Sequence, residues 1–125
     1  MVEQIFLHIS KKKTGGVVSF TINKYVYVIT KKKYDKKIKL SYSKNEIPKS
    51  VNVIRHNLIR HIFKYYNIKN NIEFVSLADI HSNGTGLGTS SAFTLASLNS
   101  LNLLLKKPVL NKKELADLAC YIEIN

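Results

Sequence analysis

Apolar and polar residues alternate along the first half of the chain in the way that β-strands require. Residues 17–30 are rich in Val, Ile, Tyr and Phe, which predicts a long strand. Apolar side chains at every second position of residues 38–42 predict a second, half-buried strand. The lysine-rich residues 31–36 lie between them, and we expect a hairpin turn that pairs the two strands.

The apolar spacing then changes to the period of amphipathic helices. The predicted elements are helices at residues 53–66, 90–105 and 112–124 and a strand at residues 72–78. Asn111 and Glu114 are spaced as a capping box at the start of the last helix. The order of elements predicts an α+β fold, with a mixed sheet and helices on one face.

Composition describes a soluble globular chain of one domain. Of its 125 residues, 45% are hydrophobic and 22% charged. No apolar run approaches the roughly 20 residues of a membrane span. Cys120 is the single cysteine, which excludes an internal disulfide and favours a cytoplasmic location.

The net charge of +12 raises the alternative of a basic nucleic-acid-binding α+β module. The cations are nearly all lysine, whereas nucleic-acid recognition favours arginine. The lysine clusters also flank predicted strands, where solvated lysines mark the strand ends and protect the edges of the sheet from pairing with another chain. We therefore expect the lysines to lie on solvent-exposed faces, and we expect no nucleic-acid partner.

His56 and His61 are five residues apart on the first predicted helix, so they do not share a metal-binding face.

The most informative segment, residues 84–91, reads Gly-Thr-Gly-Leu-Gly-Thr-Ser-Ser and lies between a predicted strand and a predicted helix. Glycines allow several backbone N–H groups to converge on one anion, and a helix start adds further unpaired N–H groups. The hydroxyl groups can bind phosphate oxygens or a phosphate-bound metal. The segment is not a Walker A loop, because no Gly-Lys-Ser/Thr follows at the required spacing. It is not a dinucleotide fingerprint either, because Thr89 stands where the third glycine belongs. Asp79, just upstream, is expected to stabilise the strand end or the loop.

Residues 84–93 resemble the second motif of the galactokinase, homoserine kinase, mevalonate kinase and phosphomevalonate kinase (GHMP) superfamily, P-x-G-x-G-L-G/S-S-S-A. Within it, the chain is most similar to sugar-1-kinases typified by D-glycero-D-manno-heptose 7-phosphate kinase, which carry a similar Leu-Asn-rich helix. Residues 15–25 and 121–124 also resemble the corresponding segments of these sugar-1-kinases. The chain departs from the motif at His81-Ser82-Asn83, which replace its Pro-containing lead-in.

The resemblance implies the superfamily's N-terminal domain, similar to the second domain of ribosomal protein S5, with ATP and Mg²⁺ as cofactors. It implies that one continuous segment binds nucleotide: Gly84, Thr85, Gly86, Leu87, Gly88, Thr89, Ser90 and Ser91. By the same resemblance, Ser90, closely followed by Ser91, and Glu123 are the candidate Mg²⁺ ligands. Magnesium prefers such hard oxygen ligands together with substrate phosphates.

The implied activity is transfer of the γ-phosphate of ATP to a sugar or sugar phosphate, foremost the anomeric hydroxyl of D-glycero-D-manno-heptose 7-phosphate. Fucokinase, galactokinase and mevalonate kinase types are the alternatives within the superfamily. Residues 1–125 match an incomplete N-terminal ATP-binding domain without the C-terminal domain. The catalytic base is expected beyond Asn125, so we expect the chain alone to be inactive and to self-associate or pair with a C-terminal partner fragment.

Overall fold

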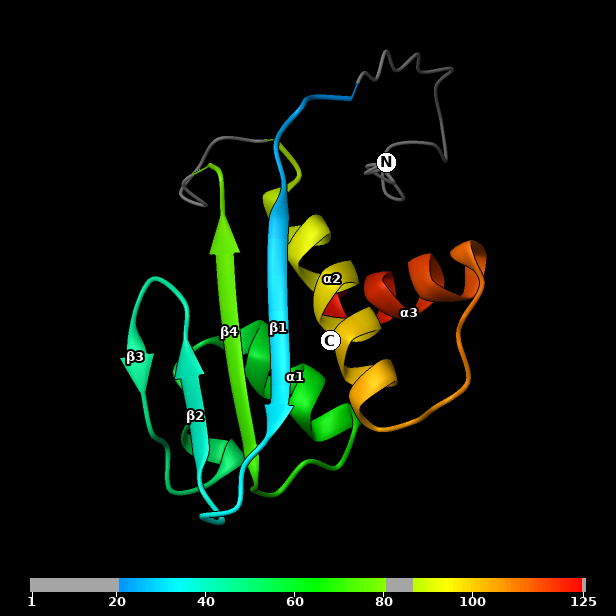
Figure 1. The fold of residues 1–125 in the computed structure, drawn as a ribbon. Coiled ribbons are helices and arrows are strands. Elements are labelled where there is room, and N and C mark those ends of the chain that lie inside the picture. The colour runs from blue at the N-terminus through cyan, green and yellow to red at the C-terminus, as the bar shows by residue number, and fades with distance from the viewer. Residues whose placement is uncertain (1–20, 81–86, 125) are drawn as a thin grey trace.

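A four-stranded sheet and a layer of helices on one of its faces make up the described part of the protein (Figure 1). The structure, a computed structural model, describes residues 21–80 and 87–124. In chain order the elements are β1 (Val26–Lys32), β2 (Ile38–Ser41), β3 (Asn45–Glu46), a 3₁₀ turn (Val51–Val53), α1 (Asn57–Tyr65), β4 (Ile72–Ala78), α2 (Thr89–Leu104) and α3 (Lys112–Ile124). The predicted α+β class with a mixed sheet is confirmed.

The strand order is β1-β4-β2-β3, so the predicted hairpin between the first two strands is wrong. β4 lies between them, antiparallel to β1 and parallel to β2. Both ends of the β1–β2 connection are bound to the chain that enters β4. The Lys33 N–H donates to the Asn71 carbonyl at 2.8 Å, and the Ile72 N–H donates to the Lys37 carbonyl at 3.2 Å. The alternation of apolar and polar residues predicted which side chains of a strand face the core. It does not specify which strand is the neighbour in the sheet.

Two element boundaries also differ from prediction. β1 begins at Val26 and continues to Lys32, and the residues that the structure describes before Val26 are not in a strand. The first helix begins at Asn57, because Ile54 is extended and His56 is the N-cap. The predicted bounds of β4 and α3 are confirmed, and those of α2 agree to within one residue at each end.

The core lies between the sheet and the helices. Its fully buried large side chains come from β2, β4, α1, α2 and the turn before α1: Phe63, Phe74, Ile38, Leu40, Ile54, Ile59, Ile62, Leu98 and Leu101. Each such side chain contributes about 1.5–3 kcal/mol by its removal from water. The Phe74 ring meets Phe63 at 5.9 Å and Phe93 at 6.0 Å between centroids. Phe93 lies in the second turn of α2, so this contact fixes the start of α2 against the centre of the sheet.

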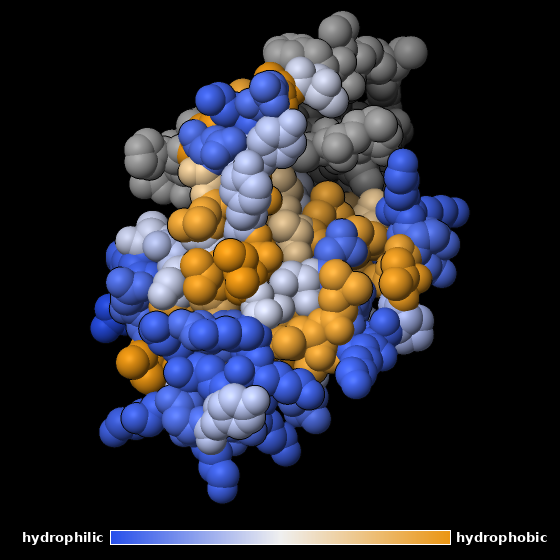
Figure 2. Space-filling view, in the orientation of Figure 1, coloured by the Kyte–Doolittle hydropathy of each residue, from blue (hydrophilic) through white to orange (hydrophobic). Residues whose placement is uncertain are grey.

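The sheet face away from the helices is partly apolar and open (Figure 2). Tyr27, Ile29 and Leu77 are 50–57% exposed there, at adjacent positions of β1 and β4. Further along the same face, the Glu73 carboxylate accepts from the Lys39 ammonium at 2.7 Å and from the Lys31 ammonium at 3.0 Å. Hydrogen bonds from these two lysines lower the pKa of Glu73 to about 2.

Candidate functional site

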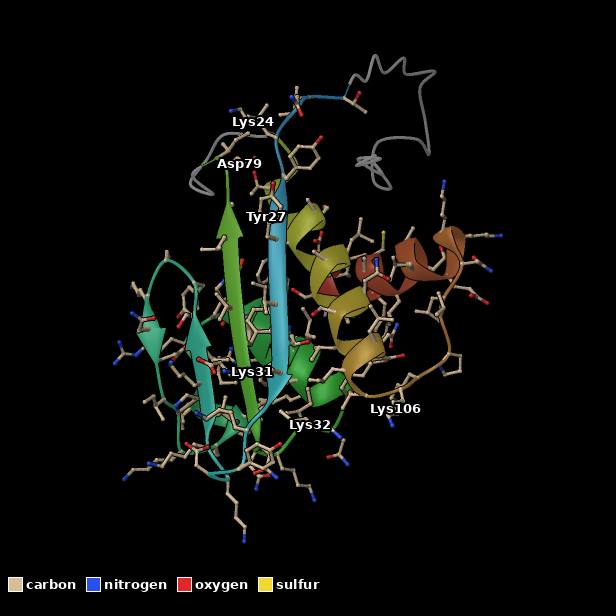
Figure 3. The ribbon with its side chains drawn as sticks, in the orientation of Figure 1. Lys24, Tyr27, Lys31, Lys32, Asp79 and Lys106 are labelled. Carbon is tan, nitrogen blue, oxygen red and sulfur yellow. The ribbon has the colours of Figure 1, made fainter. Side chains whose placement is uncertain are left out.

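The end of β4 is held to β1 by Asp79 (Figure 3). The Asp79 N–H donates to the Tyr25 carbonyl at 3.0 Å, and the Tyr25 N–H donates to the Asp79 carboxylate at 3.0 Å. The side chain therefore completes one further rung of the ladder between β1 and β4. This confirms the expectation that Asp79 stabilises the strand end from which the glycine-rich segment departs.

The second half of the glycine-rich segment leads into α2. Of the predicted nucleotide-binding residues, Gly84, Thr85 and Gly86 lie outside the described residues. Leu87 is 48% exposed, and Gly88 is the N-cap of α2 with φ 71° and ψ 19°, a left-handed conformation that favours glycine. The Gly88 carbonyl accepts from the Ala92 N–H at 3.0 Å, so the helical ladder begins here.

Gly88, the N-cap of α2, has no side chain that could cap the N–H groups of the first turn. The N–H groups of Thr89, Ser90 and Ser91 precede the first intrahelical hydrogen bond, so they have no partner within the helix. Together with the positive end of the helix dipole, they favour an anion at this position. The predicted backbone donors therefore lie on one helix terminus, as far as the structure describes them.

Glu123, from the last turn of α3, meets the first turns of α2. The Ser91 hydroxyl donates to the Glu123 carboxylate at 3.3 Å, and the Thr94 hydroxyl lies 2.8 Å from its other oxygen. The structure therefore places Ser91, and not the first-named candidate Ser90, in hydrogen-bond contact with Glu123. Ser90 is exposed, and its carbonyl oxygen lies 3.0 Å from the Thr94 hydroxyl.

Thr94 is the residue of this cluster that sequence reasoning missed. It is fully buried and lies three residues after Ser91, one helical turn along the same face. A hydroxyl residue at that spacing from a candidate metal-binding serine was the signal available in the sequence. The sequence did not reveal that α3 would bring its carboxylate to this face.

α3 is oriented by its cap and by its buried face. The Glu114 N–H donates to the Asn111 side chain at 2.9 Å, and the Asn111 N–H donates to the Glu114 carboxylate at 2.8 Å. The predicted capping box is therefore confirmed. Ala119 and Ile122 are buried in the core, so the next residue, Glu123, lies beside the start of α2.

His56 lies between two aromatic rings near the same end of α2. Its ring centroid is 5.0 Å from that of Tyr42 and 5.3 Å from that of Phe93. Burial lowers the pKa of His56, and its Nδ1 accepts from the Ile59 N–H at 3.5 Å. These contacts give His56 a packing and capping function. Among residues 21–80 and 87–124, no group of three His, Cys, Asp or Glu side chains could hold a metal ion.

Many of the described lysines lie at the end of the sheet opposite the start of α2, and this end of the molecule is strongly hydrophilic in Figure 2. Lys31 and Lys32 lie at the end of β1, and Lys106 follows α2 (Figure 3). A hollow of about 170 Å³ at this end is lined by the following residues: Lys36, Lys37, Ile38, Ile47, Pro48, Lys49, Lys69 and Asn70. In the described part of the chain, this cluster of lysines lies away from the candidate site, whereas Lys24 lies beside Asp79 (Figure 3).

A strand that ends at a glycine-rich segment, followed by a helix with an uncapped first turn, is a feature of phosphate-binding α+β proteins. The profile of the GHMP kinases N terminal domain family matches residues 21–125, and the chain belongs to this family. No curated protein matches the chain. None of the helices in the described ranges is long and apolar enough to cross a membrane.

The fold is also similar to a crystal structure of a D-glycero-D-manno-heptose 1-phosphate kinase from Bacteriodes thetaiotaomicron. The TM-score is 0.67 at 21% sequence identity, and the similarity covers 81% of this chain and 36% of the other. The chain therefore spans little more than a third of that kinase's length.

Proposed function

We propose that the chain is the ATP-binding part of a kinase that transfers the γ-phosphate of ATP to the anomeric hydroxyl of D-glycero-D-manno-heptose 7-phosphate. Membership of the GHMP kinase family supports the reaction class. The fold similarity to a heptose phosphate kinase supports the sugar class. Fucose, galactose and mevalonate remain the alternative substrates. We propose a cytoplasmic location for the protein.

In this proposal the start of α2 binds the phosphates of ATP. The N–H groups of Thr89, Ser90 and Ser91, which have no partner within the helix, donate to phosphate oxygens, together with those of residues 84–88. Glycine at position 88 lets the chain turn into the helix and leaves no Cβ between the backbone and the nucleotide. The dipole of α2 adds electrostatic stabilisation at the same point.

The residues beside these N–H groups fit a magnesium ion. Ser91 and Glu123 offer a hydroxyl and a carboxylate oxygen, and Ser90 offers a second, exposed hydroxyl. Magnesium prefers such hard ligands and is typically held by one carboxylate and substrate phosphates. The ion would neutralise charge on the β- and γ-phosphates. The observation that carries the proposal is the hydrogen bond between Ser91 and Glu123, because it brings two of the three candidate ligands together.

Phosphoryl transfer forms a bond between the sugar oxygen and the γ-phosphorus and breaks the bond to the bridging oxygen of ADP. The protein contributes positioning and charge neutralisation to this step. We propose that the proton acceptor comes from a segment beyond Asn125, and we expect the 125-residue chain to transfer no phosphate by itself.

The test is a titration of the purified chain with ATP, with and without Mg²⁺, followed by competition with RNA. Binding that depends on Mg²⁺ and withstands RNA supports the proposal. Tight, steeply salt-dependent RNA binding with no effect of ATP would instead favour the basic nucleic-acid module. Phosphorylation assays of a longer family protein that contains this segment, with the candidate sugars, would identify the substrate.

A further inference from the structure

Thr94 makes a contact that joins the start of α2 to the end of α3. Its side chain is completely buried, and its hydroxyl lies 2.8 Å from one Glu123 carboxylate oxygen. The Ser91 hydroxyl donates to the other oxygen at 3.3 Å. Two successive positions on one face of α2 therefore each hold one oxygen of the same carboxylate.

The hydroxyl of Thr94 has a choice of two acceptors. The Ser90 carbonyl, four residues earlier on the same helix, lies at 3.0 Å. A helical threonine commonly donates to that carbonyl, but its single proton can serve only one acceptor at full strength. Glu123 is closer, and an ionised carboxylate is the stronger acceptor. The proton is therefore directed to Glu123.

Burial distinguishes the two hydroxyl groups that contact Glu123. Ser91 is half-buried and Glu123 is exposed, so both are open to a ligand that arrives from solvent. Thr94 has no exposed surface, and its β-branched side chain has restricted rotation in a helix. Thr94 is therefore the fixed member of the cluster, and it holds one carboxylate oxygen while the other stays beside Ser91.

We infer that Thr94 is a positioning residue, which orients the Glu123 carboxylate toward Ser91 and toward the metal ion at the start of α2. This inference rests on the proposed function, because it assigns Thr94 to the same metal site. Groups that orient metal ligands by hydrogen bonds typically change metal affinity by about 10–100-fold when they are removed.

The first experiment tests the contact without any ligand. A double-mutant cycle combines Thr94→Val, which removes the hydroxyl at nearly constant shape, with Glu123→Gln, and urea unfolding is measured for all four proteins. Contacting residues are expected to couple, here by about fivefold in the unfolding equilibrium constant. Independent effects of the two substitutions would overturn the inference, whatever the nucleotide affinity.

The second experiment measures Mn²⁺ affinity in the presence of ATP by electron paramagnetic resonance. Thr94→Val is expected to weaken Mn²⁺ binding about tenfold, with unchanged affinity for metal-free ATP. Thr94→Ser keeps the hydroxyl and should restore Mn²⁺ binding. Ser97→Ala is the matched control. Ser97 is equally buried one turn further along α2, and its hydroxyl donates to the Phe93 carbonyl at 2.7 Å.

The two experiments distinguish a failure of the positioning role of Thr94 from a failure of the proposed function. Coupling in the cycle with unchanged Mn²⁺ affinity in Thr94→Val would overturn the positioning role and leave the proposed function intact. A wild-type chain that binds no Mn²⁺ with ATP would overturn the proposed function and the positioning role with it, while the cycle would still report the contact. An equal loss in Ser97→Ala would show that general damage to α2 explains the effect, and would also overturn the inference.

Discussion

Substitution of Gly88 by alanine should separate the folding role of this residue from its role in nucleotide binding. Gly88 is the N-cap of α2 at φ 71°, where a side chain with a Cβ is disfavoured by about 1–2 kcal/mol. Alanine also restricts the unfolded chain, which offsets about 0.4–1 kcal/mol of that cost. The expected net loss is therefore about 1 kcal/mol in the free energy of unfolding, or about 4 °C in Tm. The total is about 5–15 kcal/mol for a typical domain, so the variant should remain folded.

The effect of Gly88→Ala on nucleotide binding should exceed its effect on stability. The new methyl group lies at the helix start, beside the N–H groups that are proposed to bind phosphate. We expect Mg²⁺–ATP affinity, measured by NMR titration, to fall at least about tenfold, which corresponds to about 1.4 kcal/mol. Unchanged affinity in a variant that shows the expected stability loss would refute the assignment of Gly88 to the phosphate site.

The matched control lies at the other end of α2. Lys106 has φ 53° after the C-cap, and the Lys107 N–H donates to the Asn102 carbonyl at 2.9 Å, as in a Schellman motif. Lys106→Gly should relieve the left-handed strain, stabilise the protein by about 1 kcal/mol and leave nucleotide affinity unchanged. Opposite stability changes at the two ends, with loss of binding at only one, would show that the binding effect is local.

Three further predictions concern α3, the ion pairs and the open sheet face. Asn111→Ala removes the capping box and should cost about 1 kcal/mol of unfolding free energy in urea titrations, with weaker Mg²⁺–ATP binding because α3 carries Glu123. No change in stability would contradict the capping role. The folded pKa of Glu73 is depressed from 4.5 to about 2, so its stabilising effect is present above pH 4.5 and is lost as the pH falls toward 2. Glu73→Gln should flatten this part of the Tm–pH curve, and an unchanged curve would exclude Glu73 as its source. At high protein concentration, size-exclusion chromatography with light scattering should show self-association, and Ile29→Lys should reduce it, because Ile29 is 56% exposed on an apolar face. A strictly monomeric wild-type chain would show that this exposed apolar face does not cause self-association.

The sequence predicted local structure well where a single periodicity or cap decides it. The bounds of β4 and α3 and the capping box of Asn111 and Glu114 were of this kind. The strand order was not predictable in the same way. A helix precedes β4 in the chain, and β4 then enters the sheet between the two earlier strands β1 and β2. Pairing across that sequence distance depends on tertiary packing, which alternation does not encode.

In the candidate site too, some features follow from the local sequence and others depend on tertiary packing. The glycine-rich segment and Glu123 were identified from residue type and resemblance, and the structure brings Glu123 to Ser91. The contribution of Thr94 depends on how α3 packs across α2, which no local pattern reveals. Sequence reasoning therefore named the chemical groups, and the packing of two helices specified which serine meets the carboxylate.

The start of α2 is proposed to bind the phosphates of ATP through the N–H groups of its first turn, beside Ser91 and Glu123. The most direct measurement is a ¹H–¹⁵N NMR titration of the chain with ATP and Mg²⁺. We expect the largest saturable shifts at the amides of Gly88, Thr89, Ser90 and Ser91, and we expect these shifts to depend on Mg²⁺. Shifts confined to the lysine-rich end of the sheet, with the amides of α2 unmoved, would contradict this proposal.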